Sequence, residues 1–454
     1  MVVSLSLKNP IARIAALFVA TGLAALLVVA VLFNFIIGTM VDYRKRFNRD
    51  ELASPVYHFP SSARMHARLA EAEMMERNRD LASAEFHALE AIRLSPYDYR
   101  NPLILASIKE ASADRQAAEE QLRKALALSP TSISVRYQLA NLLVREGRVE
   151  ESIDEFRRAT ASDPRLLAGA IDLIWQVSNK DVSLIERVAG DTPKAQMVLA
   201  QFLLKQSRAE DAARIFVGID RRVRLTSVET PGIVKTFIDS GYPGLARYLW
   251  VGLASSNSET EAPLVWNGGF ETDILKNLGQ FDWTIPEWAV SKNNNRETRY
   301  ARLGVDRTTA HTGARSLKIE FAGENTTRLD GEIKQLIALR PGVRYRLECY
   351  VKSEGLLTPE GPRVVVIGGQ SESEPSKEPA SEPVRAGSND WQRLTIDFIA
   401  PQSKVAGQSS VQIAIKRIPQ FSYDEPTRGS VWFDDFKIEE QRPGAGGQGS
   451  GVRN

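Results

Sequence analysis

Cysteine is almost absent from this sequence, because Cys349 is the only one among 454 residues. A single cysteine excludes an internal disulfide and any metal site built from several cysteines. It stands in the stretch VRYRLECYV, where apolar and polar residues alternate as on a strand with one buried face. We therefore expect Cys349 to lie in a core and not to act as a reactive thiol.

The sequence also lacks a surplus of charge of either sign. Its formal net charge is +2, from 58 Lys and Arg against 56 Asp and Glu. Proteins that bind nucleic acid normally carry a basic surplus, so no nucleic-acid partner is expected. The apolar content of 43% and the length suit two or three ordinary globular domains.

Signatures of catalysis are missing as well. The sequence contains no P-loop, no H-E-x-x-H and no G-x-S-x-G motif. Asp434 and Asp435 are neighbours on an expected strand, so their side chains should diverge rather than flank a glycosidic bond. His66 and His87 fall within one expected helical hairpin, where a two-histidine metal site is the less favoured interpretation. We expect no enzyme activity and no catalytic residue.

A long apolar run is present near the N-terminus. Residues 14–38 carry no charge, and a helix of that length is about 37 Å long, enough to cross a hydrocarbon core of ~30 Å. The run is too long for a signal-peptide core, and no A-x-A cleavage site follows it. The sequence therefore predicts a membrane anchor within residues 1–50, with its transmembrane segment at about 14–38.

The orientation of this expected anchor is ambiguous. Basic residues are more frequent after the run than before it, which favours a cytoplasmic C-terminal side. They are Lys8 and Arg13 before the run, and Arg44, Lys45, Arg46 and Arg49 after it. Because the rule weakens when a long domain follows, the C-terminal part has to decide the matter.

A repeated phrase follows. AIRLSPYD at 91–98 returns as ALALSPTS 34 residues later and, more weakly, as ATASDPRL after another 34. A period of 34 is typical of helical hairpin repeats. Each phrase ends a helix at a proline, because proline lacks an N–H and clashes with the preceding turn. Small residues spaced by three and four along one helix face let the paired helix approach closely.

These positions resemble the tetratricopeptide repeat. The three blocks supply the small, large, small and proline residues of that pattern; they are Ala84, Ala88, Ala91 and Pro96; Ala118, Leu122, Ala125 and Pro130; Ser152, Phe156, Ala159 and Pro164. Glu71 and Lys109 depart from it, since the family has apolar residues there. The resemblance implies an α-solenoid of about five right-handed stacked hairpins over residues 63–254.

Such solenoids bind protein partners in a groove lined by the first helix of each hairpin. Tyr137, Asn141 and Arg145 recur every four residues on one expected first helix and would share a stripe. We predict that they line the protein-binding groove. An ordinary solvated helix face is the equally favoured alternative.

The pattern changes at residue 262. Helical periodicity stops, and short runs such as SLKIEF alternate apolar and polar residues. Seven or more such runs predict an antiparallel β-sandwich over residues 262–441. The polar, proline-rich residues 370–388 are expected to be a disordered loop, and residues 442–454 a flexible tail. The predicted fold class is therefore multidomain α + β: one transmembrane helix, an α-solenoid and a jelly-roll sandwich.

The landmarks NGGFE, HTGARSLKI, YRLECYVK, WQRLTIDF and FDDFKI resemble the galactose-binding-like and carbohydrate-binding-module superfamily. The resemblance implies sugar binding through exposed aromatic rings, for which we predict Trp288 and Tyr300. It also implies a structural calcium ion, with Glu271, Asp434 and Asp435 as oxygen ligands. A plain turn or edge-strand role for these carboxylates is the alternative.

The order of the parts resembles bacterial anchored proteins associated with exopolysaccharide assembly. It implies a non-catalytic scaffold in the inner membrane, single-pass, with its soluble domains in the periplasm. Protein partners and a polysaccharide are the expected ligands. The alternative is a general assembly scaffold of the cell envelope whose sandwich is structural and binds no sugar.

Overall fold

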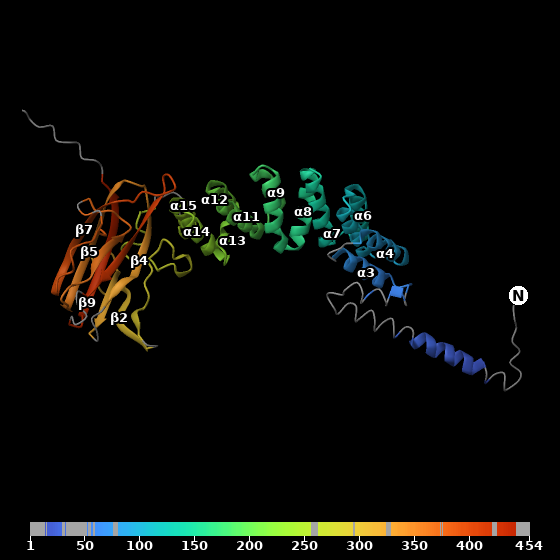
Figure 1. Cartoon of the computed structure of the whole chain (residues 1–454). Coiled ribbons are helices and arrows are strands. Elements are labelled where there is room, and N and C mark those ends of the chain that lie inside the picture. Colours follow the sequence, from blue (N-terminus) through green and yellow to red (C-terminus); the bar gives the residue numbers. More distant parts are fainter. Residues whose placement is uncertain are drawn as a thin grey trace, which may run out of the picture. The chain divides into compact units, whose positions relative to one another are not determined.

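The computed structural model divides into two compact units, residues 1–189 and 190–454. It describes residues 14, 16–29, 32, 52, 56–57, 60–75, 80–255, 262–293, 296–323, 328–372, 374, 376–419 and 425–441. Each unit is described by itself. Figure 1 shows helices in the described part of the first unit, and helices followed by strands in the described part of the second.

The described residues of the first unit include four successive helix pairs. They are α3 (Ala63–Met75) with α4 (Leu81–Leu94), α5 (Arg100–Ala111) with α6 (Arg115–Leu128), α7 (Ile133–Arg145) with α8 (Val149–Ser162), and α9 (Leu167–Val177) with α10 (Val182–Ala189). The short helix η1 (Pro164–Leu166) joins α8 to α9. These pairs confirm the prediction of a helical repeat region.

The repeated residues explain the pairing. Ala91, Ala125 and Ala159 are fully buried, and their small side chains let each second helix approach its neighbours closely. Phe156, the large residue of the pattern in the third block, is also fully buried. The second helices of the first two pairs end where the N–H four residues beyond the last alanine of the pattern bonds to the carbonyl of that alanine, at Ser95 and Ser129.

The second unit begins with helices and ends with the sandwich. Its helices are α11 (Pro193–Lys205), α12 (Ala209–Gly218), α13 (Arg221–Thr226), α14 (Thr230–Asp239) and α15 (Pro243–Ala254). Helix α11 pairs with α12, and α14 with α15. The described part of the chain therefore contains six helix pairs, one more than the sequence pattern predicts, because the later pairs no longer keep the 34-residue period.

Nine described strands form two antiparallel sheets. They are β1 (Trp288–Asn293), β2 (Arg296–Asp306), β3 (Ser316–Ala322), β4 (Leu329–Leu339), β5 (Arg344–Leu357), β6 (Arg363–Ile367), β7 (Gly387–Ile399), β8 (Ser409–Arg417) and β9 (Arg428–Glu440). One sheet has the order β1-β2-β3-β9-β5-β7 and the other β4-β8-β6. The short helix η2 (Lys276–Leu278) precedes them. The predicted β-sandwich is confirmed.

Alternating side chains of both sheets form one hydrophobic core. Along β5, Tyr345, Leu347, Cys349 and Val351 are buried, and the residues between them are only partly so. Cys349 is 1% exposed, as predicted, and burial raises the pKa of its thiol far above the ordinary value. An inert core cysteine is the consequence.

Helix α15 packs against this sandwich. Trp250 is fully buried, with its ring 5.0 Å from that of Trp266 and 5.9 Å from that of Phe281. The indole Nε1–H of Trp250 donates to the Leu278 carbonyl, and the Gly244 N–H donates to Gln408 Oε1 at 2.8 Å. The last helices and the sandwich thus share buried residues within one unit.

The expectation of a disordered loop at 370–388 is wrong for residues 379–384. The Val366 N–H donates to the Pro379 carbonyl at 2.8 Å, and the Ser381 N–H donates to the Val364 carbonyl at 2.9 Å. Val384 belongs to the hydrophobic core. Backbone groups of this stretch therefore extend the smaller sheet beyond β6. A polar composition does not prevent this, because the backbone N–H and C=O groups can still pair.

The prediction of a membrane anchor also needs correction. No helix in the described ranges combines the length and apolarity needed to cross a membrane. The prediction of a single-pass inner-membrane protein is therefore wrong. Residues 15, 30, 31 and 33–38 of the expected segment and the expected tail 442–454 lie outside the described residues.

Candidate functional site

The three residues predicted to line a protein-binding groove lie on α7. Tyr137 and Asn141 are half-buried and Arg145 is exposed. Ala140 and Val144, three and seven residues after Tyr137, are buried on the same side of α7. Tyr137 therefore lies at the edge of the buried face of the helix, and Arg145 lies at the exposed end of the stripe.

Tyr137 is held by its neighbours in two repeats. Its ring meets that of Phe156 on α8 edge-on, with the centroids 5.2 Å apart. A Cβ added at Gly169 on α9 would lie 3.1 Å from the Tyr137 hydroxyl oxygen, so glycine at 169 leaves the space that this hydroxyl occupies. Burial raises the pKa of Tyr137, which keeps the hydroxyl protonated and able to donate.

A pocket of about 560 Å³ lies at this tyrosine. It is lined by residues of α7 and of the segments that precede α5, α7 and α9: Tyr99, Thr131, Ser132, Ile133, Ser134, Tyr137, Gln138, Asp163 and Leu166. Hydroxyl and amide groups alternate with apolar side chains. The one charged member, Asp163, is paired with Arg165 at 2.8 Å. The pocket is thus nearly neutral and spans three successive repeats.

Charged side chains beside the pocket are paired between helices. Arg136 contacts Glu155 at 2.5 Å, and Arg145 forms an ion pair with Glu110. Arg145 therefore joins α7 to α5 and is not a free cation in the groove. Lys109, which departs from the repeat pattern, pairs with Glu85 at 2.6 Å and so joins α5 to α4.

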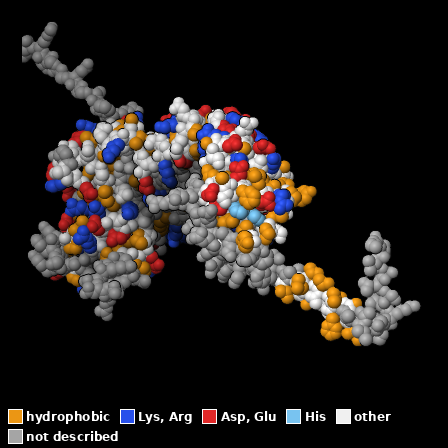
Figure 2. Space-filling model, turned by 45° about the vertical axis from the view of Figure 1, so that its right-hand side comes forward, with side chains coloured by type: hydrophobic (Ala, Val, Ile, Leu, Met, Phe, Trp, Pro, Cys, Tyr) orange, Lys and Arg blue, Asp and Glu red, His pale blue; other side chains and the backbone are white. Residues whose placement is uncertain are grey.

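The face of the molecule in Figure 2 shows acidic and basic side chains interspersed, and histidine beside hydrophobic side chains. His66 and His87 do meet, with their Nδ1 atoms 2.9 Å apart, so one ring donates a hydrogen bond to the other. His66 Nε2 lies 3.1 Å from the Pro60 carbonyl. Across the described residues, no three His, Cys, Asp or Glu side chains are placed to hold one metal ion.

The two predicted sugar-binding aromatics do not form one exposed platform. Trp288 on β1 is half-buried, and the Arg302 guanidinium lies over its ring, 6.0 Å from the centroid. Tyr300 is only 6% exposed and belongs to the hydrophobic core. Burial raises the pKa of Tyr300, and Glu332 adds to the shift. Tyr300 therefore has no face available for stacking on a sugar.

The three predicted calcium ligands do come together, around residues 311–315. Glu271 Oε1 accepts hydrogen bonds from the N–H groups of Ala314 (2.8 Å) and Arg315 (3.0 Å). Asp434 Oδ2 accepts from the N–H groups of His311 (2.7 Å) and Thr312 (3.4 Å). Asp434 is fully buried, and burial raises its pKa to about 6.

Asp435 reaches the same loop by a different route. Its Oδ2 lies 2.6 Å from His311 Nδ1, and its Oδ1 accepts from the Thr312 hydroxyl at 2.7 Å. The backbone of Asp435 has a φ of 51°, and the ladder between β5 and β9 is irregular nearby. The expected divergence of Asp434 and Asp435 is therefore wrong, because regular strand alternation is interrupted between them.

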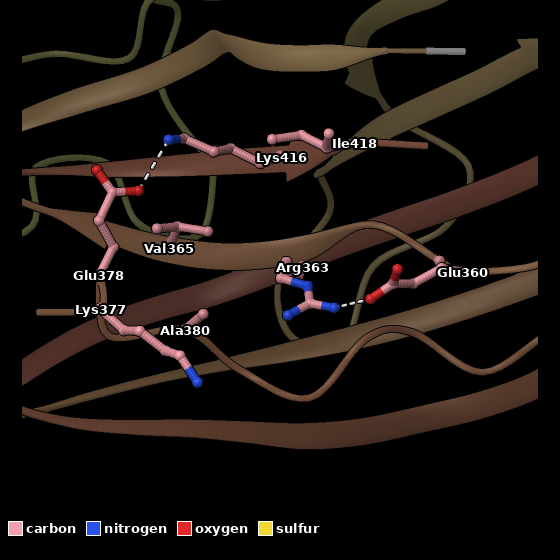
Figure 3. Close-up of a pocket in the computed structure, with 9 residues that line it drawn as sticks. Glu360, Arg363, Val365, Lys377, Glu378, Ala380, Lys416 and Ile418 are labelled. Atoms are coloured by element: carbon pink, nitrogen blue, oxygen red, sulfur yellow. Dashed lines mark hydrogen bonds and ion pairs between the residues drawn. The ribbon is translucent and has the colours of Figure 1, made fainter. Parts of the chain in front are cut away.

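A second pocket, of about 370 Å³, lies over the edge of the smaller sheet (Figure 3). Val365, Ala380 and Ile418 supply apolar surface, and charged side chains surround them. The charged members are Glu360, Arg363, Lys377, Glu378 and Lys416. Lys416 contacts Glu378 at 2.9 Å, and Arg363 pairs with Glu360. Sequence reasoning missed this pocket, because it depends on residues 377–380, which were expected to be disordered.

Comparisons with known proteins support the helical repeats. A family model described as tetratricopeptide repeat matches residues 111–170. No curated protein matches the chain. Similar solved structures include MamA (14% identity, 37% of this chain and 83% of MamA, TM-score 0.26) and Pseudomonas aeruginosa PilF (15%, 47% and 95%, TM-score 0.25). The CBM22-1 xylan-binding domain of Paenibacillus barcinonensis Xyn10C is another (12%, 39% and 93%, TM-score 0.23).

Proposed function

We propose that this chain is a non-catalytic scaffold that binds a protein partner through its tetratricopeptide-like repeats. The observation that carries the proposal is the pocket at Tyr137, which three successive repeats build together. Repeats of this kind stack into extended binding surfaces, and no single repeat could form this pocket. The family match at residues 111–170 covers most of its lining.

The chemistry of the pocket defines the partner segment. Its lining offers hydroxyl and amide groups that pair with peptide N–H and C=O groups, and apolar surface at Ile133 and Leu166. The cations beside it, Arg136 and Arg145, are already paired with carboxylates. An uncharged peptide segment with an apolar side chain at its centre is therefore the partner that fits best.

Selection of peptides from a random displayed library against the full chain tests this proposal. We expect selected peptides to share an apolar residue, and Tyr137→Ala to weaken their binding at least tenfold, about 1.4 kcal/mol or more. Tyr248→Ala is the control, because Tyr248 lies on α15 in the other unit and is 66% exposed. Equal binding to wild type and Tyr137→Ala would contradict the proposal.

We further propose that the scaffold is accessory to exopolysaccharide assembly or export, with the pocket in Figure 3 contacting the glycan. Its support is the set of N–H donors on Arg363, Lys377 and Lys416, which pair with Glu360, Glu374 and Glu378 respectively. These donors can bind the carboxylates of an acidic saccharide in place of the glutamates. The absence of an aromatic ring from this lining argues against neutral sugars, which need a stacking face.

Binding of the full chain to a glycan array checks this finer function. We expect acidic glycans to bind, and Lys416→Gln to weaken binding at least tenfold, about 1.4 kcal/mol. Lys437→Gln, on β9 in the other sheet, should leave binding unchanged. If no glycan binds, the alternative stands, in which the chain is a general assembly scaffold with a purely structural sandwich.

A further inference from the structure

The loop at residues 311–315 supplies hydrogen-bond donors where the family resemblance implies a calcium ion. Five of the six oxygen atoms of Glu271, Asp434 and Asp435 accept hydrogen bonds: Glu271 Oε1 and both oxygens of each aspartate. Four of the donors are backbone N–H groups of this loop, and the Asp435 N–H is a fifth. A calcium ion needs six to eight oxygen ligands with free lone pairs directed at it.

The direction of these groups matters as much as their number. An N–H group presents the positive end of its dipole to the carboxylate. A cation placed among these carboxylates would face the hydrogen atoms of those N–H groups and would have to displace the bonds they make. The loop therefore already compensates the negative charge that a calcium ion would otherwise compensate.

Side chains and backbone hold the loop in this donating arrangement. The His311 ring stacks on Tyr350 of β5, with the centroids 3.7 Å apart and the planes 13° from parallel. Gly313 has a φ of +66°, and a Cβ there would lie 2.3 Å from Glu271 Oε1. Ser316, which follows the loop, donates its hydroxyl to the Thr309 carbonyl at 2.6 Å and closes the loop base.

We infer that this sandwich is closed by hydrogen bonds from residues 311–315 to Glu271, Asp434 and Asp435, and that it requires no calcium ion. His311 and Thr312 are the residues that distinguish this arrangement from a calcium site, because their side chains occupy both oxygens of Asp435. The three carboxylates are then structural hydrogen-bond acceptors that join residues 267–271 and β9 to the loop.

Thermal unfolding of the full chain, followed by tryptophan fluorescence, tests the inference. A structural ion present at 100 times its Kd would raise Tm by about 5–10 °C in a unit of this size. We expect the wild-type Tm to be the same in EDTA and in excess CaCl2, and calorimetric titration with CaCl2 to show no binding. A fall in Tm on chelation that CaCl2 reverses would overturn the inference.

A variant further distinguishes stabilisation by these hydrogen bonds from stabilisation by a calcium ion. His311→Ala removes the ring stacked on Tyr350 and the donor to Asp435, so we expect Tm to fall by about 5 °C equally in EDTA and in CaCl2. Trp288→Ala, elsewhere on the same sheet, is the control and should shift Tm little. A loss of stability in His311→Ala that appears only in EDTA would contradict the inference. If the variant does not fold, the wild-type comparison still decides.

Discussion

Replacing Trp250 by alanine is expected to lower the free energy of unfolding of the 190–454 unit by about 3–5 kcal/mol, the range for deleting a fully buried tryptophan side chain. Trp250 has no exposed surface and packs its ring edge-on against Trp266 and Phe281. The substitution would also leave the Leu278 carbonyl without the indole donor. The cavity would open where α15 meets the sandwich.

Urea unfolding of the full chain, followed by far-UV circular dichroism, measures the effect. Trp288→Ala is the matched control, because Trp288 is half-buried at β1 and its loss should cost about 1 kcal/mol or less. Hydrogen exchange adds a local measurement, since amides of α15 should lose protection in Trp250→Ala. Equal destabilisation by the two substitutions would show that Trp250 does not join α15 to the sandwich.

The helical repeats and the sandwich core were predictable because their signals are local. Alanine and proline at a fixed interval specify where a helix is approached and where it ends, as Ala125 and Pro130 do. Alternation along β5 placed Cys349 in the core. Both patterns follow from one element's own periodicity, so a single sequence suffices to find them.

The site residues were harder to predict because their roles depend on partners distant in sequence. Tyr137 was placed on the groove side of α7, but the pocket also needs Tyr99 and Leu166 from neighbouring repeats. Tyr300 alternates as a surface residue should, yet it is buried in the core. Periodicity assigns a face to a side chain and cannot show what covers that face.

Backbone conformation was the other feature that the sequence pattern did not reveal. Asp434 and Asp435 were expected to diverge, and the left-handed φ of Asp435 brings both to the same loop. Residues 379–384 were expected to be disordered from their polar composition, and they pair with β6 through backbone groups. Composition describes side chains, whereas both outcomes depend on where N–H and C=O groups point.

The motif NGGFE leads to the second large effect, at Gly268. A Cβ on Gly268 would lie 2.1 Å from the Phe436 carbonyl oxygen, a backbone atom that cannot rotate away. The Phe436 N–H also donates to the Gly268 carbonyl at 3.0 Å, so the two segments are already in direct contact. Gly268→Ala is therefore expected to destabilise the 190–454 unit by at least about 3 kcal/mol, because the NGGFE segment and β9 would have to move apart.

Gly304→Ala on β2 is the control that isolates this close approach. A Cβ at Gly304 would meet no atom within 4 Å, and the residue has no positive φ. Alanine there should change the free energy of unfolding by no more than about 1 kcal/mol, and in the stabilising direction, since it restricts the unfolded chain. Urea unfolding of both variants gives the comparison. A Gly268→Ala protein as stable as Gly304→Ala would mean that the NGGFE segment and β9 are not in backbone contact, and the hydrogen-bonded closure at Glu271 would lose its structural basis.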